Sequence, residues 1–205
     1  MPRDKSESHE RIVEAAKKEF LEYGFADASL RRIAANAKIQ VSGLYKHFKN
    51  KEEMFDSLVK PAVDGFFSLY STIEGEYFSD IGKSVESGFW EGQNEVVRAM
   101  SYIYDHLDEF KLIVMKSSGT KYENYVHDIA KLDEEVTLRY LESLKKEGFK
   151  IREFNKKEFH LLVTAYTKAV FQAVSHGFTR EEAMHYAHTL DEFYTPAWKA
   201  WMGLK

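Results

Sequence analysis

Residues 29–55 read SLRRIAANAKIQVSGLYKHFKNKEEMF, and this stretch decides the fold that we expect for the first part of the chain. Apolar residues recur at every third or fourth position over 30–37, which is the spacing of one helix face. Ser29 supplies a residue type that favours the N-terminal cap of a helix. The same spacing leaves Arg31 and Arg32 on the outer side. The pattern therefore predicts a short helix with a cationic outer face.

A second short helix is predicted over residues 40–48, after a break of about three residues. Val41, Leu44 and Phe48 fall within about 60° of one another on a helical wheel, which gives a narrow inward face. The remaining positions hold hydrogen-bonding and cationic groups, namely Ser42, Gly43, Tyr45, Lys46 and His47. Two short helices joined by a turn, the second with a polar outer face, match the helix-turn-helix arrangement that enters the DNA major groove.

The segments on either side of this pair are also predicted to be helical. An apolar stripe that includes Ile12 and Phe20 precedes it and ends at Gly24, a residue that commonly stops a helix. Asn50, with Glu53 three positions later, forms a capping pattern in front of a fourth and longer helix. The first 60 residues therefore predict a compact unit of four helices.

Charge is unevenly distributed along the chain of 205 residues, whose net charge is -4. Residues 1–60 hold 12 Lys and Arg against 10 Asp and Glu, whereas residues 61–205 hold 17 against 23. Residues 28–51 contain six basic side chains and no acidic one. A basic patch on a helix-turn-helix is the charge pattern of a nucleic-acid-binding surface.

The residues Ile33, Ala34 and Ala37, followed by LYKHFKNKEEMF over 44–55, closely resemble the TetR (AcrR-type) repressor family. The resemblance implies an all-α fold, with an N-terminal helix-turn-helix DNA-binding domain at 1–60 and a C-terminal helical ligand-binding and dimerisation domain at 61–205. It also implies a ligand-responsive regulator, most simply a repressor, that binds a palindromic double-stranded operator as a homodimer. The motif covers about a quarter of the chain.

Roles in DNA binding can be assigned to the matching positions. The resemblance places Ser29, Tyr45, His47 and Lys51 against the DNA backbone, and the basic pair Arg31 and Arg32 belongs to the same surface. Side chains at the outer tip of the second short helix would face base edges, and these are Gln40, Val41, Ser42, Gly43 and Lys46. The chain departs from the family pattern at Lys38, where glycine is usual, and at Gln40, where Ser or Thr is common.

The remaining residues predict helices alone, with a kink at Pro61. We expect helices over 83–106, 108–116, 121–147, 156–176 and 180–201. Capping boxes of Asn155 with Glu158 and of Thr179 with Glu182 should start the last two. Both of these helices have broad apolar faces, and the family resemblance favours a dimer interface formed by them.

A small-molecule effector would occupy a pocket between helices of the C-terminal domain. The absence of concentrated charge suggests an apolar or aromatic ligand. Candidate wall residues are Phe89, Trp90, Met100, Tyr104, Phe110, Met115, Tyr122, Tyr125 and Tyr166, with His106, Asn124 and His127 as polar anchors.

Several other classes of protein are disfavoured. The chain has no cysteine, which excludes disulfides, thiolate metal sites and cysteine nucleophiles, and no catalytic motif or cofactor site is expected. Glu182 and His185 have the spacing of helical metal ligands, but the second such repeat that a bundle site needs is missing. A helical-bundle enzyme and a peripheral partner-binding or membrane-surface module with a basic surface remain as alternatives. With no apolar run of membrane-spanning length and no signal peptide, we expect a cytoplasmic protein.

Overall fold

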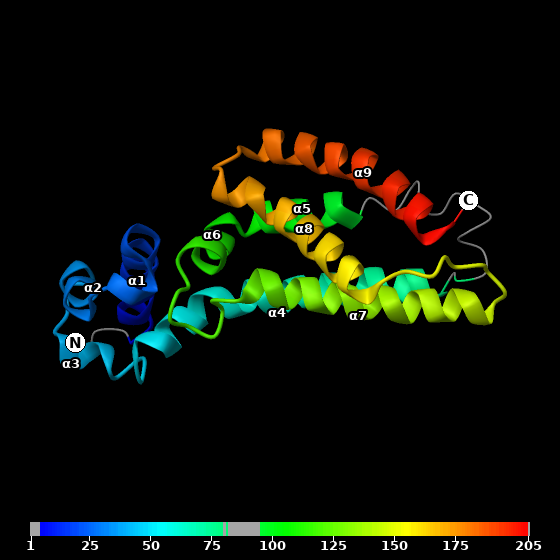
Figure 1. Ribbon diagram of the computed structural model, residues 1–205. Coiled ribbons are helices and arrows are strands. Elements are labelled where there is room, and N and C mark those ends of the chain that lie inside the picture. Colours follow the sequence, from blue (N-terminus) through cyan, green and yellow to red (C-terminus); the bar gives the residue numbers. More distant parts are fainter. Residues whose placement is uncertain (1–4, 80, 82–94, 205) are drawn as a thin grey trace. The chain divides into compact units, whose positions relative to one another are not determined.

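The computed structural model describes residues 5–79, 81 and 95–204, and within these ranges every regular element is an α-helix (Figure 1). The all-α prediction is confirmed. Contacts divide the chain into two compact units. The first contains Met1–Asp64 together with His106–Tyr125, and the second contains Gly65–Asp105 together with Val126–Lys205. The backbone therefore passes from one unit to the other at three points, rather than at a single boundary near residue 60.

The first unit is formed by α1 (Lys5–Asp27), α2 (Leu30–Asn36), α3 (Val41–Leu44), the start of α4 (Lys51–Ser79) and α6 (Leu107–Met115). Helix α1 packs against α2 and α6, and α2 packs against α3. The apolar stripes predicted for this part of the chain form its core, in which the buried side chains include Ile12, Phe20, Ile33, Leu44, Phe48, Met54, Phe55 and Phe110.

The regular path of α1 ends where glycine was expected to stop it. Gly24 has φ 77°, a backbone conformation that side chains with a Cβ rarely adopt. This bend brings the N–H of Phe25 to the carbonyl oxygen of Lys116, 2.8 Å away, in the segment that follows α6. The glycine therefore joins α1 to the part of the first unit that comes from later in the sequence.

The N-terminal cap predicted for α4 is present, since the Asn50 side chain accepts a hydrogen bond of 2.7 Å from the N–H of Glu53. Helix α4 then continues through Pro61 to Ser79 without restarting. Its first part lies in the first unit and its second part in the second unit.

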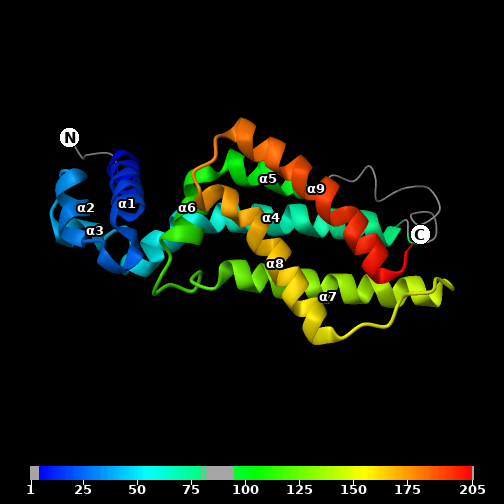
Figure 2. The same cartoon turned by 45° about the horizontal axis from the view of Figure 1, so that its top comes forward.

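The second unit combines the end of α4 with α5 (Glu95–Asp105), α7 (Tyr125–Lys146), α8 (Lys156–Ser175) and α9 (Arg180–Met202). Helix α5 lies alongside α9 in both views, and α8 also packs against α9 (Figures 1 and 2). One end of this unit is filled by a cluster that comprises Tyr140, Leu141, Leu144, Phe159, Val163, Met202 and Leu204.

The capping box predicted for α9 is confirmed, since Thr179 and Glu182 bond reciprocally. At α8 the cap residue is Asn155 as predicted, but its side chain accepts from the N–H of Lys157 and no reciprocal box with Glu158 accompanies it. Helix α7 begins at Tyr125 rather than at 121, because Ser117 and Thr120 direct the preceding residues into turns. The first part of the helix expected over 83–106 lies outside the described residues. No described helix is both long and apolar enough to cross a membrane.

Candidate nucleic-acid interface and ligand cavity

Helix α3 presents a polar, cationic surface at the outside of the first unit. Gln40, Ser42, Tyr45 and Lys46 are exposed, and the Tyr45 side chain is 55% accessible. The regular helix spans only Val41–Leu44, which is shorter than the predicted range of 40–48. Hydrogen bonds from the N–H groups of residues 46–48 to carbonyls three or four positions earlier continue the turn to Phe48. The exposed groups therefore share one short rigid segment.

The other α3 positions are partly covered. Val41, Gly43 and His47 are half-buried, and the His47 ring lies 5.5 Å from the ring of His9. A Cβ added at Gly43 would meet Ile39 at 3.5 Å, an ordinary van der Waals contact. The fold itself thus has room for a side chain at this position. A glycine that packing does not require fits a surface where another molecule approaches the backbone closely.

Four of the basic residues at this surface are unpaired within the described part of the chain. Arg31, Lys38, Lys46 and Lys49 are all exposed, and none of them forms an ion pair with a described carboxylate. Unneutralised cations of this kind are available to phosphate groups.

Arg32 differs from these residues because its guanidinium is bound inside the unit. It donates to both carboxylate oxygens of Glu19 and to the carbonyl of Asp27, and it lies over the Tyr23 ring. Burial alone would raise the pKa of Glu19, but hydrogen bonds from Arg32 and Ser29 hold that pKa below its ordinary value. Arg32 therefore joins α2 to α1. Its side chain is still 46% accessible, and its contact with DNA stays a prediction.

Lys51 is also committed internally. Its ammonium donates to the carbonyl oxygens of Phe25, Ala26 and Ala28 at 2.6, 3.1 and 3.2 Å, and it lies 4.6 Å from the centre of the Phe25 ring. An ammonium has three N–H donors, and all three are used here. Lys51 therefore holds the segment between α1 and α2, and its contact with a phosphate stays a prediction.

The turn between α2 and α3 contains Lys38 with φ 57°, in the left-handed region. The N–H groups of Lys38 and Ile39 donate to the carbonyls of Ala35 and Ala34 and close the turn. The turn geometry thus requires the conformation that glycine adopts most easily, although the sequence has lysine.

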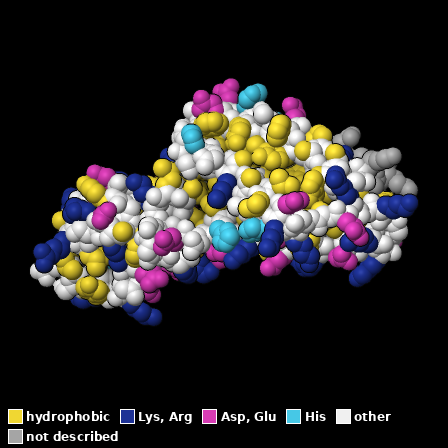
Figure 3. Space-filling view, viewed as in Figure 1, with side chains coloured by type: hydrophobic (Ala, Val, Ile, Leu, Met, Phe, Trp, Pro, Cys, Tyr) yellow, Lys and Arg dark blue, Asp and Glu magenta, His cyan; other side chains and the backbone are white. Residues whose placement is uncertain are grey.

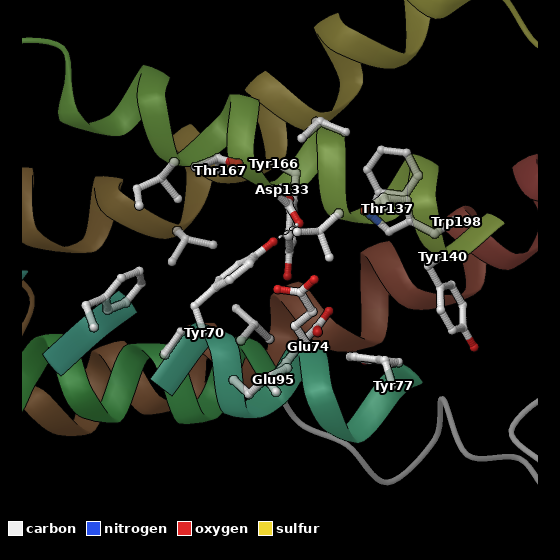
Figure 4. Close-up of a pocket in the computed structure, with 18 of the residues that line it drawn as sticks. Tyr70, Glu74, Tyr77, Glu95, Asp133, Thr137, Tyr140, Tyr166, Thr167 and Trp198 are labelled. Carbon is white, nitrogen blue, oxygen red and sulfur yellow. Dashed lines mark hydrogen bonds between the residues drawn. The ribbon is translucent and has the colours of Figure 1, made fainter. Parts of the chain in front are cut away.

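The second unit contains a cavity of about 170 Å³. Helices α4, α5, α7, α8 and α9 all contribute to its wall (Figure 4). The wall is mainly aromatic and aliphatic, and its aromatic members are Phe66, Tyr70, Tyr77, Phe78, Tyr140, Phe159, Tyr166, Phe171 and Trp198. A wall of this kind with a few polar groups is typical of a small-molecule site.

Three carboxylates, Glu74, Glu95 and Asp133, also line the cavity, and its described lining contains no Lys, Arg or His. The Tyr70 hydroxyl donates to Asp133 at 3.1 Å, and the Tyr77 hydroxyl donates to Glu95. Burial raises the pKa of Asp133 to about 6, against a hydrogen bond from Tyr70 that lowers it. Burial, reinforced by the charge of Asp133, raises the pKa of Glu95 to about 7. Both acids therefore lie where their charged forms are poorly stabilised.

Of the residues that we expected to form a ligand pocket, the structure places Tyr166 in this cavity wall. Phe89 and Trp90 lie outside the described residues. Met100 is buried elsewhere in the second unit, and Tyr104 donates to the carbonyl of Phe178. His127 is exposed near the start of α7. The others belong to the first unit, namely His106, Phe110, Met115, Tyr122, Asn124 and Tyr125.

Comparison with known proteins identifies the first unit. The family model described as "Bacterial regulatory proteins, tetR family" matches residues 12–58, which include α2, α3 and the turn between them. Residues 12–58 form a TetR-family domain. An HTH-type transcriptional regulator of Staphylococcus aureus (strain USA300) is 26% identical in an alignment of 145 residues that covers 63% of this chain and 78% of that protein.

Solved structures of TetR-family proteins share the fold. A TetR-like transcriptional regulator from Rhodococcus sp. RHA1 aligns over 98% of this chain and 97% of its own, with 20% identity and a TM-score of 0.57. FadR from Bacillus subtilis, in complex with stearoyl-CoA, aligns over 89% of this chain and 95% of its own, with 14% identity and a TM-score of 0.53.

The TetR-family assignment makes this protein a DNA-binding transcriptional regulator and sets the enzyme alternative aside.

The structure also accounts for the spacing of Glu182 and His185, which resembles that of a pair of metal ligands. The Glu182 carboxylate accepts hydrogen bonds from the N–H and the hydroxyl of Thr179, so it serves as a helix cap. No group of three or more potential metal-binding side chains occurs among the described residues.

Proposed function

We propose that the protein is a repressor that binds a palindromic DNA operator as a homodimer and releases it when a small molecule occupies the cavity of the second unit. The observation that supports this proposal is that the basic residues of the first unit fall into two groups, those bonded within the unit and those exposed without an ion pair to a described residue. Arg32 and Lys51 are used to build the unit, whereas Arg31 and Lys46 stay exposed and unpaired within the described chain, beside Gln40.

Base reading belongs to the exposed residues of α3 in this proposal. Gln40 can address adenine and Lys46 can address guanine in the major groove, while Ser42 can address either. In this proposal Tyr45 and Arg31, which are exposed, contact phosphates together with the N-terminus of α2 at Ser29. His47 contributes less side-chain surface because it is half-buried beside His9.

A homodimer through α8 and α9 is supported by apolar side chains left exposed on these helices. Leu161, Leu162 and Phe193 are 67%, 41% and 71% accessible. The space-filling view shows hydrophobic side chains gathered over α8 and α9 (Figure 3). A monomer rarely leaves such a surface in water, and a two-fold dimer covers it with the same surface of a second copy. Two recognition helices then read two half-sites, which gives the specificity that one short helix lacks.

Coupling between the cavity and α3 is supported by the connectivity of the chain. Helix α4 carries cavity residues such as Tyr70 and also residues of the first unit such as Phe55. The segment that follows α6 is bound to α4 within the first unit, because Asp56 accepts from Tyr122 at 2.5 Å and pairs with Lys121 at 2.6 Å. A ligand that favours one arrangement of α4 and α7 can therefore shift the population of DNA-binding conformations.

The experiment that tests this function is selection of bound sequences from random duplex DNA at two salt concentrations. We expect a recovered sequence with two-fold symmetry and a salt dependence that reflects several phosphate contacts. Recovery of DNA without a consensus, or no recovery, would contradict an operator-specific regulator.

A further inference from the structure

The cavity combines an aromatic wall with acidic groups that lack cationic partners. Arg139, near the rim, pairs with Glu74 at 2.6 Å, and Arg98 pairs with Glu76 at 2.6 and 3.1 Å. Arg139 and Arg98 are therefore already paired with the carboxylates of Glu74 and Glu76. Glu95 and Asp133 form no ion pair with any described residue, and their hydrogen bonds are with tyrosine hydroxyls. Burial raises the pKa of Glu95, and this effect is larger than that of the Arg98 charge, which lowers it.

The Tyr166 side chain adds a polar group to the cavity wall. It lines the cavity and is half-buried, and burial raises the pKa of its hydroxyl well above the ordinary value. Figure 4 shows Tyr70, Asp133 and Tyr166 turned toward a common central space, with Glu74 and Glu95 close by. A hydroxyl on the cavity wall can form a hydrogen bond with a ligand.

The charge of the lining discriminates between classes of ligand. An anion would be placed beside Glu95 and Asp133, and like charges in a poorly solvated site repel strongly. A neutral apolar molecule would leave both acids without a cationic partner. A cation would neutralise them, and the faces of rings such as those of Tyr166 and Trp198 attract positive charge as well.

We propose that the effector of this protein is an organic cation with an apolar or aromatic body, whose positive charge lies between Glu95 and Asp133 and whose body contacts the aromatic wall. This proposal rests on the proposed function, because it names the chemical class of the effector. A cavity of roughly 150 Å³ accommodates a benzene-sized molecule, so the space here suits a single aromatic ring that carries a compact ammonium group.

The occupancy of such a site depends on pH. The pKa values of about 7 for Glu95 and about 6 for Asp133 mean that acidification removes the charges that bind the cation. The other titratable or charged groups around them come from every helix of the wall, namely Tyr70, Glu74, Glu76 and Tyr77 of α4, Arg98 of α5, Arg139 of α7, Tyr166 of α8, and Asp191 and Tyr194 of α9. Binding therefore strengthens from pH 5 to pH 8.

The test compares three molecules of nearly the same shape by calorimetry with the full chain. The probes are benzyltrimethylammonium, its neutral isostere neopentylbenzene, and the anion hydrocinnamate. At pH 8 we expect the ammonium to bind at least tenfold more tightly than either of the others. Because its charge is permanent, any change in its affinity between pH 5 and pH 8 reports protonation of the protein, and we expect at least a tenfold loss at pH 5.

Variants locate the site. The double variant Glu95→Gln with Asp133→Asn should lose at least tenfold in affinity for the ammonium, whereas Glu135→Gln, an exposed acid of α7, should not change it. Equal or tighter binding of the neutral or anionic probe, unchanged binding by the double variant, or no saturable binding of the ammonium would overturn the proposal. The pH titration of the unmodified protein tests the same two acids even if the double variant fails to fold. DNA selection is a separate measurement. A failure of the ligand proposal would therefore not contradict the proposed DNA-binding function.

Discussion

Replacement of Glu95 by glutamine should stabilise the ligand-free protein at alkaline pH. The folded state holds the pKa of Glu95 at about 7, whereas the unfolded chain has the ordinary value of 4.5. The folded state therefore retains a proton that the unfolded chain releases, so this group favours folding below pH 4.5. That contribution is lost as the pH rises through 7. The difference of about 2.5 units corresponds to about 3 kcal/mol. Solvent screening of the accessible part of Glu95 reduces this, and we expect a gain of about 1–3 kcal/mol.

The assay is urea denaturation at pH 5, 6, 7 and 8, followed by tryptophan fluorescence, to which Trp198 and Trp201 of the second unit contribute. The variant should exceed the unmodified protein in free energy of unfolding at pH 8, and this advantage should shrink steadily toward pH 5. Glu135→Gln is the matched control, because it removes an exposed carboxylate from the same unit and should change little. A Glu95→Gln variant that is less stable at pH 8, or whose effect does not depend on pH, would refute the assignment of Glu95 as a poorly stabilised acid.

Further substitutions test the DNA-binding surface, the first unit and the dimer interface. Lys46→Ala should relax the base preference measured by DNA selection. Lys51→Met removes three hydrogen bonds to carbonyls and should lower the free energy of unfolding, measured by urea denaturation, by about 1–3 kcal/mol. A Lys51→Met protein of normal stability would show that those bonds contribute nothing. Lys38→Gly should raise the melting temperature, since relief of the left-handed conformation is worth about 1 kcal/mol; a lower melting temperature would count against strain in this turn. Phe193→Glu combined with Leu161→Glu should convert a dimer to a monomer in light scattering at micromolar concentration, and an intact dimer would place the interface elsewhere.

The helix-turn-helix could be predicted because its determinants are local in sequence. Ser29 and Asn50 cap the helices that follow them, and the apolar spacing of Ile33, Leu44 and Phe48 identifies the buried face. Each of these signals involves residues only a few positions apart. The roles of Arg32 and Lys51 could not be predicted in this way, because their partners lie 5 to 26 residues earlier in the chain. The sequence around a basic residue at a family DNA-contact position does not show whether its side chain is exposed or forms hydrogen bonds within the protein.

The cavity could not be predicted because five helices distant in sequence supply its wall. One signal of it was nevertheless present. Asp133 lies on the same face of its helix as Ile129, Val136 and Tyr140, so a carboxylate interrupts an otherwise apolar stripe. A charged residue on an inward face indicates either a buried ion pair or a polar ligand group. Aromatic composition alone pointed instead to residues of the first unit, such as Phe110 and Tyr122, whose side chains are used in packing.

Release of DNA by occupancy of this cavity can be measured by fluorescence anisotropy of the selected operator duplex bound to the protein. Addition of benzyltrimethylammonium at pH 8 should release the duplex from the unmodified protein. It should leave the duplex bound to the Glu95→Gln, Asp133→Asn double variant, and the Glu135→Gln control should respond as the unmodified protein does. An operator complex that persists while calorimetry shows the cation bound, or equal release from the double variant, would contradict a regulator controlled through this cavity.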